Sequence, residues 1–69
     1  MLSTIAKYIY TVYRLKSVSL AAQELYISQP AVSMAIKQLE DRLGSPLFVR
    51  TSKGVVLTSE GQVLYTYLD

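Results

Sequence analysis

Polar and apolar positions follow the period of an α-helix from Ser28 to Gly44, which predicts one amphipathic helix. Its apolar stripe consists of Val32, Ile36, Leu39 and Leu43. Ser28 is a favourable N-cap, because its hydroxyl can accept a hydrogen bond from the first turn. Pro30 falls in that first turn, where its missing N–H costs nothing, and Gly44 suits the left-handed residue that ends many helices. These signals predict a helix over residues 28–43.

The opposite side of this predicted helix carries a polar row near its N-terminus. Gln29, Ser33 and Lys37 are spaced four residues apart, so they lie along one face. Their tips are hydrogen-bond donors and acceptors rather than a set of matched ion pairs. A helix with one packed face and such a row is of the kind that enters the major groove of DNA. On this pattern alone, a solvated surface helix is the alternative.

Two further helices are predicted before this one. Residues 3–16 carry apolar positions at helical spacing, and Val18 to Tyr26 form a shorter helix with Ser19 as its N-cap. The residues expected to face inward from the shorter helix are Ala21, Ala22 and Leu25. Only a very short connection separates it from Ser28. Two short helices joined in this way, the second polar on its outer face, are typical of a helix-turn-helix.

The period changes after Gly44, and the next segment reads as a β-hairpin. Residues 47–49 and 55–57 predict two short strands, and Thr51 to Gly54 predict the turn between them. An isolated hairpin is unstable in water, so its apolar residues are expected to dock on the helices. These residues are Leu47, Phe48 and Leu57. Arg50 and Lys53 are then left at the tip, and a hairpin after a helix-turn-helix is a wing.

A fourth helix is predicted to begin after Thr58, which is a suitable N-cap, with Glu60 near the positive end of the helix dipole. Its apolar edge consists of Val63, Leu64, Tyr67 and Leu68. The sequence stops at Asp69 without a C-cap, so we expect the natural chain to continue. The predicted organisation is therefore one domain over residues 1–57 and the start of a linker or dimerisation helix over residues 58–69.

Composition narrows the possible functions. The chain has 69 residues and a net charge of +2, without cysteine or histidine, so disulfides and Cys/His zinc sites are excluded. Hydrophobic residues make up 51%, which suggests that some apolar surface meets a partner. No apolar run approaches the length of a membrane span. No convergent catalytic set and no glycine-rich phosphate loop are apparent, so we expect no enzyme. The fold class predicted is mainly α, a winged helix-turn-helix.

The sequence resembles the N-terminal DNA-binding domain of LysR-type transcriptional regulators. The residues that carry the likeness run in the family's order and spacing, and they are Ser19-Leu20-Ala21-Ala22, Leu25, Ile27-Ser28-Gln29-Pro30-Ala31-Val32-Ser33, Gln38-Leu39-Glu40, Leu43-Gly44, Pro46-Leu47-Phe48, Arg50, Leu57-Thr58 and Gly61. The resemblance implies a cytoplasmic protein that binds double-stranded operator DNA as a homodimer, without a cofactor. It also implies that the fourth helix pairs two subunits and that a small-molecule effector acts only through a C-terminal domain absent here.

The helix from Ser28 would then be the recognition helix, with the wing over residues 47–57 on the DNA backbone. The candidate DNA-binding residues are Ser28, Gln29, Pro30, Ser33, Met34, Lys37, Arg50 and Lys53. Gln29 can bond adenine N6 and N7 in a bidentate way, and Ser33 can reach a base or a phosphate. Lys37 and Arg50 are expected on phosphates, which position the protein without specifying sequence. Lys53 at the wing tip either does the same or stays in water.

The recognition helix also departs from the family. Arg is frequent in the family at the position of Met34, and Met cannot donate to a phosphate or to guanine. Met34 can instead touch a thymine methyl group or fill space. Further along, Glu40 and Asp41 would repel phosphates, so this end of the helix is expected to point away from DNA. The rival function is a winged-helix module that binds another protein rather than DNA.

Overall fold

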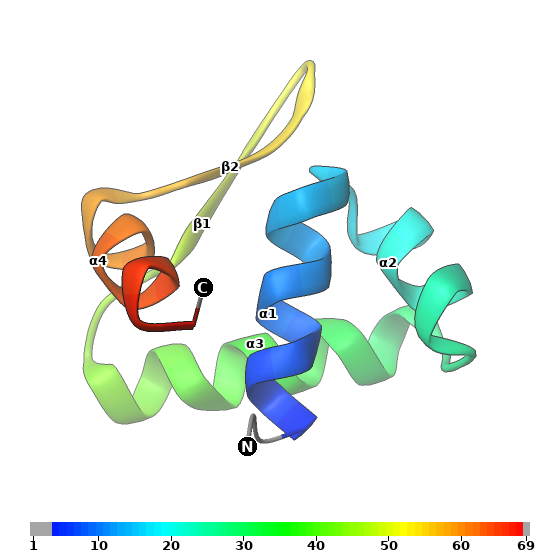
Figure 1. Cartoon of the computed structure of the whole chain (residues 1–69), viewed down its shortest axis with the longest axis horizontal. Helices are drawn as coiled ribbons and strands as arrows, with labels where there is room; N and C mark the ends of the chain where they lie inside the picture. Colours follow the sequence, from blue (N-terminus) through cyan, green and yellow to red (C-terminus); the bar gives the residue numbers. More distant parts are fainter. Residues whose placement is uncertain (1–3, 69) are drawn as a thin grey trace.

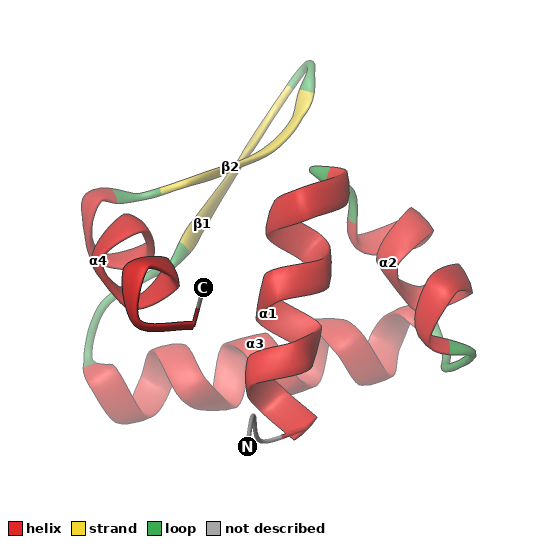
Figure 2. Cartoon of the chain, in the orientation of Figure 1, coloured by secondary structure: helices red, strands yellow, loops and turns green. Residues whose placement is uncertain are grey.

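The computed structural model describes residues 4–68, apart from the side chain of residue 68, and residue 3 of the first predicted helix lies outside this range. The described chain folds into four helices and a two-stranded antiparallel sheet (Figures 1 and 2). In chain order the elements are α1 (Thr4–Leu15), α2 (Val18–Leu25), α3 (Gln29–Leu43), β1 (Phe48–Thr51), β2 (Gly54–Leu57) and α4 (Ser59–Leu68). This arrangement confirms the predicted fold class, a winged helix-turn-helix of mainly helical content.

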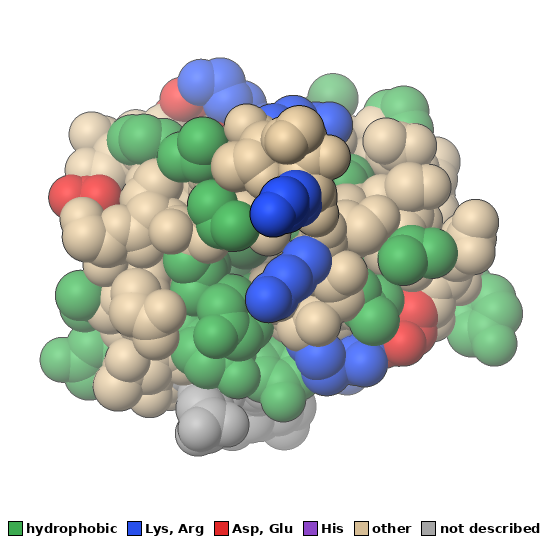
Figure 3. Space-filling model, turned by 90° about the horizontal axis from the view of Figure 1, so that it is seen from above, with side chains coloured by type: hydrophobic (Ala, Val, Ile, Leu, Met, Phe, Trp, Pro, Cys, Tyr) green, Lys and Arg blue, Asp and Glu red, His purple; other side chains and the backbone are tan. Residues whose placement is uncertain are grey.

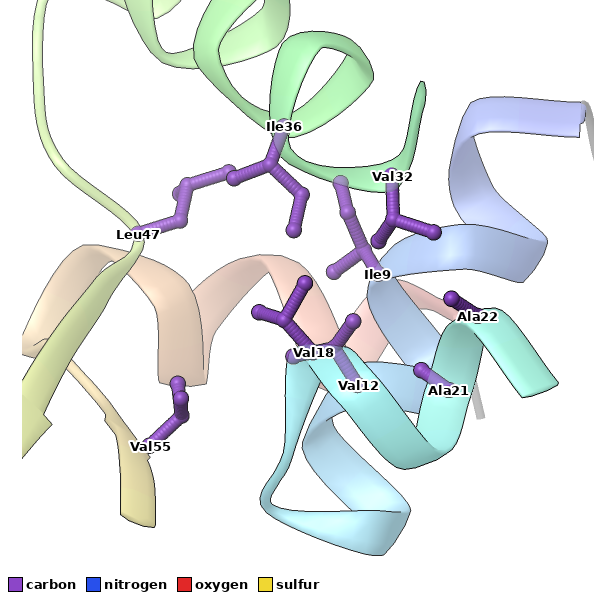
Figure 4. Packing of buried hydrophobic residues seen from close by; sticks show 9 residues of the cluster. All are labelled: Ile9, Val12, Val18, Ala21, Ala22, Val32, Ile36, Leu47 and Val55. Atoms are coloured by element: carbon purple, nitrogen blue, oxygen red, sulfur yellow. The ribbon is translucent and has the colours of Figure 1, made fainter. Parts of the chain in front are cut away.

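The core lies between the first three helices and the base of the hairpin (Figure 4). It consists of Ile9, Val12, Val18, Ala21, Ala22, Val32, Ile36, Leu47 and Val55. Helix α3 runs behind α1 in Figure 1, and α2 lies beside the N-terminal end of α3. The small side chains of Ala21 and Ala22 are both buried, as expected for a close helix contact. Each of the first three helices therefore buries one face against the others, which is how a small domain forms a single core.

The caps predicted for α3 and α4 are confirmed. The Ser28 hydroxyl accepts a hydrogen bond from the Ala31 N–H at 3.2 Å, and Gly44 ends α3 with a φ of 74°. The Thr58 hydroxyl accepts from the Gly61 N–H at 3.0 Å. Each hydroxyl thereby satisfies one of the backbone donors that a helix start leaves without an internal partner.

The N-cap predicted for α2 is wrong. Ser17, not Ser19, precedes the helix in an extended conformation, and its hydroxyl accepts from the Leu20 N–H at 3.0 Å. The reason is the core: Val18 is buried, so the helix has to begin at this residue to turn its side chain inward. Ser19 therefore lies exposed in the first turn.

The end of α2 also differs from the prediction. Helix α2 ends at Leu25, and Tyr26 adopts a left-handed conformation with a φ of 59°. Its N–H donates to the carbonyl groups of Ala22 and Gln23, which closes the helix and starts the turn toward α3. The Tyr26 side chain is 95% exposed.

Toward its tip the hairpin is longer than predicted, by two residues on β1 and by one residue on β2. The strands pair Phe48 with Leu57 and Arg50 with Val55, and the ladder continues to Thr51 and Gly54. Arg50 is consequently in the middle of β1, and its predicted place at the wing tip is wrong. A loop of only two residues leaves no room for it there, because the pairing extends to the residues that flank the loop.

The hairpin docks on α1 near its tip and on α4 at its base. The Val55 N–H donates to the Lys16 carbonyl oxygen at 3.1 Å, at the end of α1. Gly54 has a φ of 123°, and a Cβ atom there would lie 2.6 Å from the same oxygen. A Cβ atom on Gly61 would collide with the Leu47 carbonyl oxygen. Both glycines therefore permit close backbone approaches that hold the wing and α4 in place.

Two apolar stripes are only partly buried. Leu43 is 52% exposed, although the pattern predicts it in the buried stripe of α3, because the core ends before the last turn of this helix. On α4 Leu64 packs against the core, whereas Val63 and Tyr67 are exposed. The side chain of Leu68 lies outside the described residues.

Helix α4 is further held by aromatic contacts with α1. The ring of Tyr65 stacks on Tyr10 with centroids 5.6 Å apart, and it meets Tyr13 at a centroid distance of 3.9 Å. Aromatic pairs of this kind add to the apolar area that the rings already bury. The tyrosines thus fix the start of the predicted linker helix to the first helix of the domain.

Candidate nucleic-acid interface

The N-terminal half of α3 presents most of the predicted recognition residues to solvent. Gln29 is the first residue of the helix and is exposed, as is Pro30. Ser33 is half-buried on the side that faces the wing, and Met34 is 63% exposed. The Ser28 hydroxyl is already engaged as the cap, although its side chain is exposed. The helix start therefore offers both polar and apolar groups on its outer surface.

Two shallow hollows separate α3 from the wing, and Arg50 lines both. The first, which we call the α3 hollow, has a volume of about 200 Å³ and is lined in part by Ser33, Lys37 and Arg50. The second, the α2 hollow, has a volume of about 210 Å³ and is lined in part by Lys16, Gln29 and Arg50. Arg50 in the middle of β1 thus lies beside the polar row of α3.

A row of basic side chains crosses this side of the molecule. Figure 3, which views the domain from above, shows Lys and Arg side chains along the middle of the face. Three of these cations line the hollows. Lys37 shares the α3 hollow with Arg50, and Lys16 shares the α2 hollow with Arg50. The charges come from α3, β1 and the end of α1, so only the fold brings them together. Such a row is the electrostatic footprint typical of a surface that binds the phosphate backbone.

Lys37 does not extend freely, because its ammonium group donates to Asp41 at 2.9 Å, one helical turn further. This hydrogen bond, together with the negative charge of Asp41, raises the pKa of Lys37 above its ordinary value. Only this last member of the polar row is paired, and its partner Asp41 lies outside the row, so the row is not a set of matched ion pairs. Both side chains are exposed, so the pair is weak and the ammonium remains available to a stronger anion.

Lys53 occupies the two-residue loop of the hairpin and is exposed. Its N–H donates to the Thr51 hydroxyl at 3.2 Å, and this hydroxyl donates in turn to the Gly54 carbonyl at 3.0 Å. These bonds order the loop backbone, so the lysine side chain projects from a defined turn. Among the predicted wing cations, Lys53 alone lies at the tip.

Glu40 has a structural role that the sequence does not reveal. Its carboxylate accepts from the Leu47 N–H at 2.6 Å and from the Phe48 N–H at 3.4 Å. These donors lie at the entry to β1, so the carboxylate fastens the C-terminal half of α3 to the wing. The charge that was expected to repel phosphates is thus directed at backbone donors within the domain.

The roles of two other residues are not predicted from the sequence, although one of these roles could have been. Lys16 ends α1 with a φ of 55° and lines the α2 hollow, but nothing in its sequence context distinguishes it from a solvated lysine. Ser17 could be identified as the cap of α2, because the inward positions of this helix begin at Val18. In both cases the residue belongs to the connection between α1 and α2.

A second surface lies around α4 and differs in character. An apolar groove of about 370 Å³, which we call the α4 groove, is lined in part by Leu43, Val63, Leu64 and Tyr67. Val63 is 60% exposed and Tyr67 is 82% exposed. Leu43, absent from the predicted dimerisation set, joins the groove because α3 ends beside α4. Its exposure is therefore part of a continuous apolar surface.

Within the described residues, no group of three or more acidic, His or Cys side chains is placed to hold a metal ion. In the same part of the chain, every helix is too short or too polar to cross a membrane. The features that remain are the polar row of α3, the cations beside it and the α4 groove.

A helix-turn-helix with a two-stranded, cation-bearing wing beside its second helix is a winged helix-turn-helix domain. The model of the family described as "Bacterial regulatory helix-turn-helix protein, lysR family" matches residues 5–62, so this chain belongs to the lysR family. The RuBisCO operon transcriptional regulator of Allochromatium vinosum is 52% identical over 56 residues, which cover 81% of this chain and 18% of that protein. The chain spans 16% to 20% of the length of this and two further curated relatives.

Solved structures agree with this assignment. The DNA complex of the BenM DNA-binding domain with catB site 1 is 37% identical, with a TM-score of 0.91 over 99% of this chain and 76% of that one. A transcriptional regulator of the LysR family from Eggerthella lenta is 41% identical, with a TM-score of 0.90 over 99% of this chain and 97% of that one. The fold is therefore the same in both comparisons, and the second structure is of a LysR-family protein.

Proposed function

We propose that this chain is the DNA-binding domain of a LysR-type transcriptional regulator and binds double-stranded operator DNA without catalysing a reaction. The polar row of α3 enters the major groove, and the wing lies along the backbone. The position of Arg50 supports this proposal most directly, because it places a cation from the wing beside Ser33, Lys37 and Gln29 of α3. The BenM domain, similar over nearly the whole chain, was solved as a DNA complex.

Base readout falls to the start of α3. Gln29 has an exposed amide at the first helical position, where the end of a helix can insert into the groove. Its amide can bond adenine N6 and N7 together, which discriminates this base from the others. Ser33 lies one turn further on the same flank, with Pro30 beside it on the outer surface. The Ser28 hydroxyl serves as the cap and can also donate to a phosphate oxygen.

Backbone contacts fall to the cations around the two hollows. Arg50 and Lys37 flank the α3 hollow, and Lys53 extends the positive charge to the wing tip. We add Lys16 to this set, because it shares the α2 hollow with Arg50 and Gln29. A phosphate at this position would be held by two cations from different elements. Such contacts fix the orientation of the domain on the duplex without reading sequence.

A titration of the chain with duplexes from a binding-site selection tests this function. Each neutralised phosphate contributes to the salt dependence, so a dimer with about three to five contacts per subunit should give a log–log slope of roughly −5 to −9. A scrambled duplex of the same length is the control and should bind more weakly at every salt concentration. Failure to enrich any sequence, together with a flat salt response, would refute the DNA-binding function.

The α4 groove is proposed as the surface through which two copies associate. Val63 and Tyr67 are large apolar side chains that remain exposed, and Leu64 connects them to the core. Two copies that cover each other's grooves would remove this apolar area from water. Leu68 follows on the same helix, and its side chain lies outside the described residues. Dimerisation would also place two recognition helices on one duplex, as palindromic half-sites require.

The separate positions of the DNA-binding surface and the α4 groove also divide the chain into two parts. Residues 1–57 form the DNA-binding unit, and residues 58–69 begin a linker helix toward an effector-binding domain outside this chain. A small-molecule effector would act through that domain in a cytoplasmic regulator. The relatives exceed this chain several-fold in length, which leaves ample room for it.

A protein-interaction module is the second candidate function, and two exposed side chains favour it. Tyr26 and Met34 are large and apolar in part, and they are 95% and 63% exposed. A protein partner would bury both, without steep salt dependence. The salt titration separates the two functions, because only phosphate neutralisation produces the slope expected for DNA.

A further inference from the structure

Met34 occupies the outermost position of α3. It is two residues from each of the buried side chains Val32 and Ile36, which places it about 160° from both on a helix of 3.6 residues per turn. Its side chain is 63% exposed, so the core takes little of its apolar surface. A methionine in this place points toward whatever α3 approaches.

The neighbours of Met34 make the outer surface of this half of α3 apolar. Pro30 lies one turn before Met34 and is exposed, and so is Ala31. The next charged residue along this surface is Lys37, which is paired with Asp41. The hydrogen-bonding side chains Gln29 and Ser33 lie to the wing side, as the two hollows show. From Pro30 to Met34 the outermost surface consequently has no side-chain donor or acceptor of its own, whereas its flank has both, and the exposed amide of Gln38 follows one turn after Met34.

This division limits what Met34 can recognise in a major groove. The base edges there present donors and acceptors together with a single apolar feature, the 5-methyl group of thymine. A thioether side chain matches only the apolar feature, and its three rotatable bonds let it adapt to the position of the methyl group. The cations beside the hollows would keep the helix in the groove while Met34 makes this contact.

We infer that Met34 is a specificity-determining residue that reads a thymine of the operator through its 5-methyl group. The inference rests on the proposed DNA-binding function and names one feature of the sequence that is bound. The thymine lies in the part of each half-site that faces the outer surface of α3. Pro30 borders the same methyl group, and Gln29 reads an adjacent base pair.

Replacement of thymine by uracil tests this contact, because it removes the methyl group and leaves base pairing unchanged. Each thymine of the selected operator is replaced in turn, symmetrically in both half-sites, and affinity is measured at fixed salt. At one thymine position, affinity should fall about fourfold per half-site, which is the effect expected from the loss of one buried methyl group. In Met34→Ala the loss at this position should disappear, and Met34→Leu should retain most of it.

Gln23→Ala is the matched control, because Gln23 is exposed on α2 and outside both hollows. This variant should show the same loss on uracil substitution as the original chain. Equal sensitivity to uracil in Met34→Ala and the original chain would overturn the inference, as would an operator insensitive to every replacement. In both cases the chain would still bind the operator, so the proposed DNA-binding function would not be refuted. Failure to enrich any duplex would instead remove the DNA-binding function.

Discussion

The α3–wing surface and the α4 groove are the two parts of this domain that the core leaves open, and they are built from opposite chemistry. Around the hollows, cations from three elements surround short polar side chains. Around α4, large apolar side chains meet one another and the end of α3. Exposed cations favour a polyanion, and exposed apolar area favours a second apolar surface. A domain of 69 residues can therefore separate two kinds of association on two faces.

This contrast has a measurable consequence. Association through the α3–wing surface should weaken steeply with salt, because bound cations displace counterions from DNA. Association through the α4 groove should depend on protein concentration and change little with salt, because apolar burial does not involve charge. The substitutions below alter one surface while leaving the other intact.

The largest effect is expected from Val63→Glu, which places a charge in the α4 groove without disturbing the core. Sedimentation equilibrium should show a monomer, since burial of an unpaired carboxylate opposes association. Affinity for a duplex with two half-sites should fall by about 10² or more, because linked binding events are lost. Binding to a single half-site should not change. Thr66→Glu, with the same charge on the same helix outside the groove, should dimerise normally. A dimeric Val63→Glu would contradict the assignment of this surface.

Gln29→Ala should have the next largest effect, and it concerns sequence preference rather than total affinity. Discrimination at one base pair should fall by roughly 1–3 kcal/mol, while affinity for unrelated duplexes should hardly change. Binding-site selection with both proteins at one salt concentration measures this. Gln38→Ala removes the same side chain from an exposed position of α3 outside both hollows, and its preference should match the original. Retention of full preference by Gln29→Ala would mean that another residue reads the base.

Arg50→Ala should weaken binding to all duplexes by a similar factor. Because the side chain is expected on a phosphate, the log–log salt slope should become shallower by about one for each bound subunit. Lys16→Ala should act in the same direction, because Lys16 shares the α2 hollow with Arg50. Arg42→Ala is the control, since Arg42 is an exposed arginine of α3 that lines neither hollow. A changed sequence preference in Arg50→Ala would place the wing on bases.

The smallest effect is expected from Asp41→Asn, which releases Lys37. Asp41 raises the pKa of Lys37, so its removal lowers this pKa toward the ordinary value of 10.5, and the ammonium stays charged at neutral pH. An exposed pair of this type is weak, so affinity for any duplex should rise by only about twofold at low salt. The increase should vanish in Lys37→Ala, and its persistence there would assign the effect to Asp41 alone.

The fold follows from local signals to a large extent. Apolar residues at helical spacing, the serine and threonine caps and the closing glycine are properties of neighbouring residues, so they predict α3, α4 and the hairpin without a partner. The predicted boundaries differ by one or two residues where two local signals compete. Ser17 and Ser19 are both suitable residue types for a cap, and Val18, the first inward-facing residue of α2, selects Ser17.

The polar row of α3 is local in the same sense, because the helical period alone aligns Gln29, Ser33 and Lys37. The position of this row relative to the wing is not determined by neighbouring residues. Arg50 is 17 residues beyond Ser33 in the chain, and only the docking of the hairpin on α1 brings both to one hollow. Lys16 reaches the same region because the Val55 N–H bonds to its carbonyl oxygen. Neither the contact of Arg50 with the α3 hollow nor the position of Lys16 beside the wing can be predicted from the residues that adjoin them in the sequence.

The sequence by itself therefore determined the elements, their caps and the residue types on the outer side of α3, because these depend on neighbours within a few positions. Only the tertiary structure decided which side chains meet across elements. It assigned Glu40 to the entry of β1 and left Leu43 exposed beside α4, although both follow the pattern of one helix. The physical reason is that burial and backbone hydrogen bonds between distant segments depend on how whole elements pack, and the spacing within one element carries no record of this.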